Sequence, residues 1–174
     1  EHTASRYGLP VTQLPFMREV TWGYNGEPNG PAGHPWNLVD RMILEGKTLG
    51  NSDWRAVPPF AGNSICDNVD LIANEVDNWL KTLGYTREGE YYRAGENTAK
   101  TVALFSHGGS SNAVLAHIFN LPFPYVIQVF RANFTSITVL NFPDTPGDLV
   151  MPVLELVNDC AHIRDLNADQ FFGN

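Results

Sequence analysis

Apolar residues repeat with helical spacing in the middle of the chain and predict its longest helix. Between residues 64 and 83 they fall on one face: Ile65, Val69, Ile72, Val76, Trp79, Leu80 and Leu83. Ser64, with Asp67 three positions later, is similar to a capping box and predicts the start of this helix. Two shorter helices are also predicted. Residues 1–8 end in Gly8, and residues 36–44 are followed by Gly46.

The second half of the chain carries strand patterns. The near-continuous apolar run TVALFS, residues 101–106, is typical of a central strand that is covered on both faces. Polar residues after it offer caps for a buried helix at residues 113–119. Further strands are predicted at residues 136–142 and 150–157, and a hairpin around Glu88–Gly89. This alternation of strand, helix and strand predicts a layered α/β domain.

Glycine and proline interrupt residues 24–35 so often that they predict a long loop. Loops of this length in compact domains are often lids or binding loops. We assign residues 24–63 to a loop-rich insertion and residues 1–174 to a single domain, because no repeat, low-complexity tract or linker divides the sequence.

The charge balance argues against two classes of partner, nucleic acids and anionic membranes. Eleven basic residues against nineteen acidic residues give a formal charge of −8, which repels the phosphate backbone of nucleic acids and anionic membranes. No apolar run approaches the roughly 20 residues of a membrane span, and no signal peptide opens the sequence. Two cysteines do not encode a disulfide framework, and a cytoplasmic location is expected.

The segment FSHGGSSN, residues 105–112, is the strongest candidate for a ligand site. Ligands of open α/β sheets bind at the carboxyl ends of strands, and free N–H groups at the start of a helix favour an anion. Gly108 and Gly109 allow the main chain to approach a ligand closely. His107 can donate a hydrogen bond or a positive charge to a phosphoryl oxygen. The alternative is a tight turn whose histidine only bonds to its own loop.

Esterases of the α/β-hydrolase fold offer another interpretation of the His-Gly-Gly run. They use it as an oxyanion-hole loop, well ahead of a Gly-x-Ser-x-Gly nucleophile motif. No such motif follows Gly109, and the nearest string, residues 109–113, ends in Ala113. The sequence therefore does not favour an esterase.

Glu19, in the segment PFMREVTWG, is a candidate proton donor. Desolvation and a neighbouring anion both raise the pKa of a carboxyl group, so one beside a phosphate can hold its proton near neutral pH. Such a group can protonate a leaving oxygen. An Arg-Glu dipeptide is, however, usually a solvated surface pair, and this signal is weak on its own.

Other candidate residues lie in the insertion and in the second half of the chain. His34, Trp36 and Trp54 have positions from which they can contribute to substrate binding. His117 lies within an apolar helix and is expected to be a core residue. Neither HExxH nor CxxC spacing occurs, so we expect no metal site and no cofactor.

Taken in order, these segments resemble the histidine phosphatase superfamily, which has the phosphoglycerate mutase-like fold. The resemblance rests on HTASRYGLPVTQLPFMREVTWG, on TVALFSHGGSSNAVLAHIFNLP, and on the closing FTSITVLNF and VLELVNDCAHI. It spans nearly the whole chain and is most specific at residues 106–109. It implies a three-layer α/β/α domain with a mostly parallel central sheet.

The resemblance also implies a mechanism. In that family a histidine of an Arg-His-Gly motif attacks phosphorus, a second histidine and arginines hold the phosphoryl oxygens, and a carboxylic acid protonates the leaving group. By resemblance the second histidine is His107, the proton donor is Glu19, and Gly108 approaches the phosphate. The expected substrate is a small phosphomonoester; a mutase reaction and a homodimer are left open.

The sequence contains no Arg-His-Gly motif, so the family's nucleophile is absent. We expect that the chain begins inside the family's first helix and lacks the preceding strand, which would leave apolar neighbours unpaired. The alternatives are a catalytically inactive relative that binds phosphorylated ligands, and a purely structural domain. The last of these leaves His107 and Glu19 unexplained.

Overall fold

The structure is a computed structural model that describes residues 2–24, 34–98 and 101–164. The described helices are α1 (His2–Tyr7), α2 (Pro35–Leu44), α3 (Ser64–Thr82), α4 (Gly108–Ile118) and α5 (Phe123–Val129), with 3-10 turns at Pro15–Met17, Trp54–Ala56 and Ala161–Ile163. The strands are β1 (Tyr85–Glu88), β2 (Tyr91–Ala94), β3 (Ile137–Asn141), β4 (Leu149–Val150) and β5 (Val153–Asp159). No described helix has both the length and the apolar composition needed to cross a bilayer.

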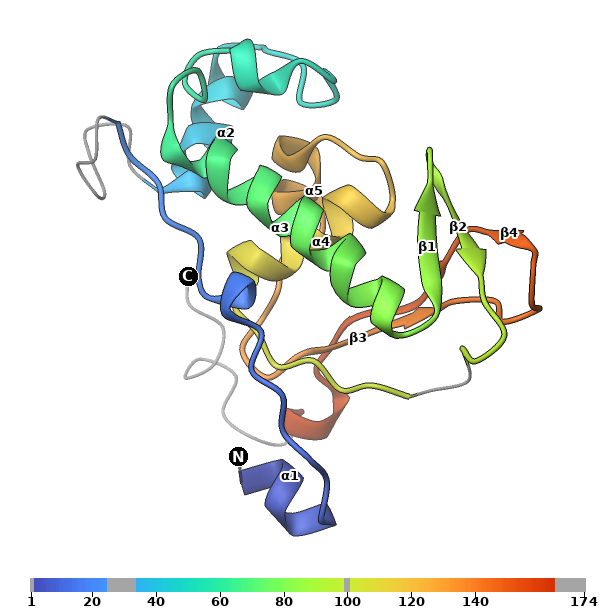
Figure 1. Ribbon diagram of the computed structural model, residues 1–174. Coiled ribbons are helices and arrows are strands. Elements are labelled where there is room, and N and C mark those ends of the chain that lie inside the picture. Colours follow the sequence, from blue (N-terminus) through green and yellow to red (C-terminus); the bar gives the residue numbers. More distant parts are fainter. Residues whose placement is uncertain (1, 25–33, 99–100, 165–174) are drawn as a thin grey trace.

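The strands form two small sheets, and the expected fold class is wrong. One sheet has the order β1-β2-β4 and the other pairs β3 with β5. Every strand pair in the described part of the chain is antiparallel. The molecule is therefore not a three-layer α/β/α domain with a mostly parallel central sheet. Figure 1 shows α2 to α5 gathered in one region with the strands beside them, and α1 apart from the other helices.

The expected central strand at residues 101–106 is absent, and this explains the missing parallel sheet. The segment has no regular structure, and no described residue makes a backbone hydrogen bond with it. All six residues are exposed, including Phe105 at 76%. An apolar run becomes a buried strand only when neighbouring strands bind its N–H and C=O groups on both sides. Among the described residues this segment has no such neighbour.

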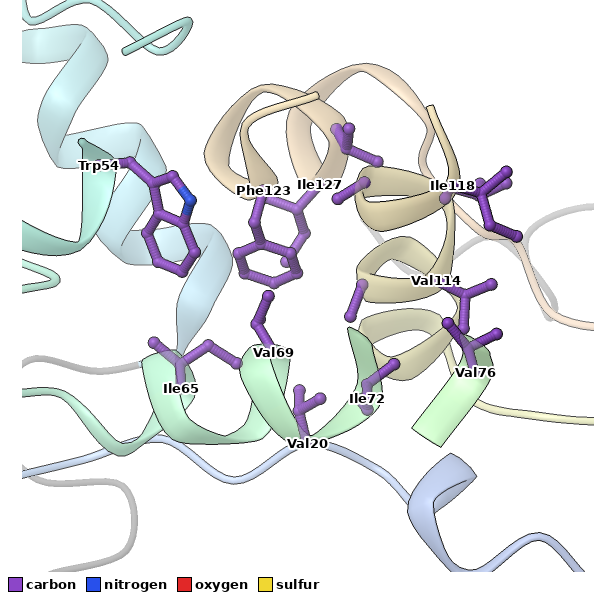
Figure 2. Close-up of a cluster of buried hydrophobic side chains, with 14 of the residues drawn as sticks. Val20, Trp54, Ile65, Val69, Ile72, Val76, Val114, Ile118, Phe123 and Ile127 are labelled. Carbon is purple, nitrogen blue, oxygen red and sulfur yellow. The ribbon is translucent and has the colours of Figure 1, made fainter. Parts of the chain in front are cut away.

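The hydrophobic core lies between α3, α4 and α5 (Figure 2). The face of α3 predicted from its apolar spacing is buried there, from Ile65 to Leu80. Phe123 of α5 contacts Trp54, with ring centroids 5.6 Å apart. Trp54 is thus a core residue, and its contribution to substrate binding stays a prediction.

Asn63, and not Ser64, caps the start of α3. Its Oδ1 accepts hydrogen bonds from the N–H groups of Ile65, at 3.0 Å, and Gly23, at 3.1 Å. The Ser64 N–H donates to the carbonyl oxygen of Gly23. Asn63 is buried, so these bonds fix the segment that follows Glu19 against the first turn of the longest helix.

The predicted hairpin is confirmed, and a polar network attaches it to α3. The Tyr92 hydroxyl of β2 donates to Asp77 Oδ1 at 3.0 Å and accepts from Arg87 Nη1 at 2.8 Å. Burial raises the pKa of Tyr92, so this hydroxyl stays protonated and donates at any ordinary pH.

The predicted helices and later strands are confirmed to different extents. Helices form at the three positions predicted in the first half of the chain, and the helix of the second half begins earlier, at Gly108. The strand predicted at residues 136–142 is β3. The single strand predicted at residues 150–157 is divided between β4 and β5. Most of the predicted loop at residues 24–35 lies outside the described residues.

Cys66 provides a test of the packing around α3. Both cysteines are free thiols, and burial raises the pKa of Cys66 from 9.0 to about 11. Since the thiolate is the reactive form, its fraction at pH 8 falls about 100-fold. We expect iodoacetamide to alkylate Cys66 about 100-fold more slowly in the native protein than in urea, as measured by mass spectrometry. Equal rates in the two states would contradict this packing.

Candidate active site

The structure brings His107 and Glu19 together, as the resemblance implied. His107 Nδ1 lies 3.9 Å from Glu19 Oε2, which is too far for a hydrogen bond but close enough for a charge pair when the imidazole is protonated. Their side chains are 58% and 44% exposed. Both groups are therefore accessible to a ligand from solvent.

Two serines hold the segment of Glu19 against the start of α4. Ser106 Oγ and Ser110 Oγ lie 2.8 Å apart, and they lie 3.1 and 3.2 Å from the carbonyl oxygen of Met17. Figure 1 shows the 3-10 turn that contains Met17, in blue, beside the first turn of α4, in yellow. These hydroxyls therefore connect both ends of the His107 turn to the chain that leads to Glu19.

Gly109 allows the close approach of these two segments. A Cβ atom built on Gly109 would overlap Val20 Cγ2 and lie 2.7 Å from Glu19 Oε1. The same carboxylate oxygen accepts the Val20 N–H at 2.9 Å, which fixes the orientation of the carboxyl group. At Gly108 an added Cβ would make only ordinary contacts, at 3.8 Å, with Trp36 and Ala132. The tight packing is thus specific to Gly109.

The start of α4 offers free donors beside His107. His107 is the N-cap residue, and its side chain makes no capping hydrogen bond. The N–H groups of Gly108, Gly109 and Ser110 have no acceptor among the described residues, as is usual for the first turn of a helix. The helix dipole adds partial positive charge at this end. An anion can approach this end at Gly108, which is half-buried, whereas Gly109 and Ser110 are buried.

Three aromatic side chains, Trp22, His34 and Trp36, lie beside the site and form an aromatic stack. The His34 ring contacts both tryptophans, with ring centroids 4.3 Å from each and with tilted ring planes. Burial lowers the pKa of His34, and the nearby Glu19 carboxylate partly opposes this effect. The predicted residues His34 and Trp36 are therefore adjacent to the site formed by His107, Glu19 and Gly108.

No family model, curated protein or solved structure matches the chain.

The arrangement can bind a small anion and transfer a proton to it. His107 and the free N–H groups of α4 are donors, and Glu19 supplies a carboxyl group within reach of the same space. No described arginine makes an ion pair or a hydrogen bond with His107 or Glu19. Within the described residues no group of three or more His, Cys, Asp or Glu side chains has the arrangement of a metal site.

His117 lies outside the site. It follows His107 by ten residues on α4, and its Nε2 is 2.9 Å from Asp77 Oδ2 but lacks the alignment of a hydrogen bond. His117 is half-buried and lies at the edge of the core, close to its predicted position within it.

Several residues of the site were missed by the sequence interpretation. The sequence interpretation gives no hydrogen-bonding role to Ser106 and no role to Trp22, and it relates Gly109 to the approach of a ligand and not to packing against Val20. Two signals could have indicated them. Ser106 and Ser110 are four positions apart around the histidine, and Trp22 follows Glu19 by three positions.

Proposed function

We propose that this site binds the phosphoryl group of a small phosphomonoester and takes part in its hydrolysis. The observation that carries the proposal is the proximity of His107 and Glu19 at the start of α4, where unpaired N–H groups favour an anion. By resemblance to histidine phosphatases, His107 holds the phosphoryl group and Glu19 protonates the leaving group. We propose a relation to that superfamily on the sequence motifs alone, because the described strands do not form its parallel sheet.

In the proposed reaction an attacking histidine forms a bond to phosphorus while the ester P–O bond breaks. His107 and the N–H groups of Gly108 and Gly109 hold the phosphoryl oxygens, and Glu19 gives its proton to the leaving oxygen. A water molecule then attacks phosphorus and breaks the P–N bond. Glu19 takes up the proton of that water, and inorganic phosphate leaves. Over the two steps Glu19 returns to its protonated form, and the phosphoryl group passes from the ester to water.

The attacking histidine has no Arg-His-Gly motif among these 174 residues. The proposal therefore names no nucleophile among them. We also propose a cytoplasmic location, based on the two free thiols.

A second function has one observation in its favour. Because the sequence contains no Arg-His-Gly motif, the same site can act as a binding module that holds a phosphorylated ligand without hydrolysing it. The two functions differ in turnover and not in the anion that they bind. A mutase, which retains the phosphoryl group for transfer to a second hydroxyl, is a variant of the first function.

Hydrolysis of p-nitrophenyl phosphate by the full protein tests the proposal. We expect His107→Ala to lower kcat/KM about 100-fold or more, because one donor to the transition state is lost. His117→Gln, roughly 15 Å further along α4, serves as the matched control and keeps the activity. Equal rates for His107→Ala and the wild type would exclude His107 from catalysis. Phosphate binding without any hydrolysis would favour the binding module over the phosphatase.

Glu19→Gln tests the proton donor separately. We expect it to slow the hydrolysis of alkyl phosphates by about 100-fold, because an alkoxide leaves poorly without a proton. The rate for p-nitrophenyl phosphate, whose leaving group is stable as an anion, changes little. Glu90→Gln, in the turn between β1 and β2, is the control. An unchanged rate for alkyl phosphates would remove Glu19 from this function.

A further inference from the structure

We infer that the group attached to the phosphate is aromatic, so that the preferred ligands are aryl phosphomonoesters. This inference rests on the proposed function and concerns the same site. It depends on where Trp22, His34 and Trp36 lie relative to the groups that would bind and protonate the ester.

The aromatic stack is adjacent to both parts of the site. Trp36 packs against the start of α4, where its Cζ2 and Cη2 atoms lie 3.8 Å from the position of a Cβ on Gly108. Trp22 follows Glu19 in the same segment, and the Glu19 charge acts on His34. A phosphoryl group at the first turn of α4 would therefore have the carboxyl group and the aromatic stack as its neighbours.

The position of Glu19 determines which part of the ester meets the stack. A proton donor must contact the leaving oxygen, so the organic group lies on the Glu19 side of the phosphorus atom. The aromatic stack, whose three side chains are half-buried, lies near Glu19 through His34 and near Gly108 through Trp36. None of these side chains carries a fixed charge, and burial keeps His34 neutral near pH 7.

Aromatic rings favour a planar, apolar group on this side. Ring pairs with centroids 4.5–7 Å apart contribute roughly 0.5–1.5 kcal/mol beyond the area that they bury. A glycerol group has neither a ring face to stack nor, among these three side chains, a charged partner for its hydroxyls. The aromatic stack thus discriminates between leaving groups. The phosphoryl group itself is bound by the start of α4.

Calorimetry on the full protein with three probes tests this inference. The probes are phenyl phosphate, methyl phosphate and inorganic phosphate, at a pH where all are dianions. We expect phenyl phosphate to bind about five- to tenfold more tightly than methyl phosphate. Trp36→Ala is expected to remove most of this difference and to leave the affinity for inorganic phosphate unchanged.

Trp79→Ala is the matched control. Trp79 is also half-buried, but it lies fifteen residues along α3 from the turn that contacts Gly23, at roughly 22 Å. This variant is expected to keep the preference for phenyl phosphate. Circular dichroism checks that both variants fold. If Trp36→Ala does not fold, an NMR experiment on the wild-type protein with phenyl phosphate takes the place of this variant. The inference then predicts transfer of magnetisation from the phenyl protons to the Trp36 indole.

The outcomes separate this inference from the function on which it rests. Equal binding of phenyl and methyl phosphate, or a preference that survives in Trp36→Ala, would overturn the aromatic specificity while phosphate binding stands. Absence of binding by all three probes would overturn the proposed function and this inference together. Absence of the NMR transfer would show that the ring lies elsewhere.

Discussion

Phe123→Ala is expected to lower the free energy of unfolding by about 3–5 kcal/mol, the usual cost of truncating a fully buried phenylalanine. Phe123 is 1% exposed, and it packs between Trp54 and the apolar face of α3 (Figure 2). The change removes apolar contacts and leaves a cavity where α5 meets α3. Urea unfolding followed by tryptophan fluorescence measures the effect.

Phe134→Ala provides the matched control for this prediction. The same side chain is removed, but Phe134 is 69% exposed. We expect a change within about 0.5 kcal/mol, as is usual for surface positions. A similar loss of stability in both variants would show that the core does not lie between α3, α4 and α5.

Gly109→Ala is expected to destabilise the protein by about 1–3 kcal/mol and to weaken phosphate binding. The new Cβ would overlap Val20 and crowd the Glu19 carboxylate. The segment that carries Glu19 must then move away from α4, so one change affects both stability and the site. Urea unfolding and calorimetry with inorganic phosphate measure the two effects.

Gly108→Ala isolates the cause of this loss. Both glycines lie in the first turn of α4, and both substitutions gain helix propensity of up to about 1 kcal/mol. An added Cβ at Gly108 makes only ordinary contacts. We therefore expect Gly108→Ala to be neutral or slightly stabilising. Equal stability of the two variants would contradict the close packing of Glu19 and Val20 on α4.

Local patterns in the sequence were sufficient to predict four of the five described helices, but not α5. The apolar face of α3 repeats over five turns, and burial of that face confirms the pattern. Its cap is Asn63 and not Ser64: Asn63 Oδ1 accepts the local Ile65 N–H and also the Gly23 N–H, which is far away in the sequence. Local spacing contains no information about such a partner.

The sheets could not be predicted in the same way. The TVALFS run has the composition of a buried strand, but strand formation requires partners on both sides, and the described chain supplies none. The two antiparallel sheets arise from long-range pairing of short segments, such as β2 with β4. A run of apolar residues indicates a preference for burial and does not identify the neighbour.

The site was predicted in part. The residues themselves indicated an anion site at His107, because a histidine and two glycines precede a helix. Its pairing with Glu19 came only from the resemblance, since the two residues are distant in the sequence and neither predicts the other. The contact between Gly109 and Val20, and the stack around His34, depend on tertiary packing that no local motif encodes.

The central claim is that a phosphoryl group binds at the start of α4 against His107. An NMR titration of the full protein with inorganic phosphate tests it most directly, through the amide signals of Gly108, Gly109 and Ser110 and the imidazole signals of His107. We predict that millimolar phosphate shifts these signals together along one saturable curve and leaves the His117 imidazole unmoved. Unchanged signals at the start of α4, with or without shifts elsewhere, would contradict the account.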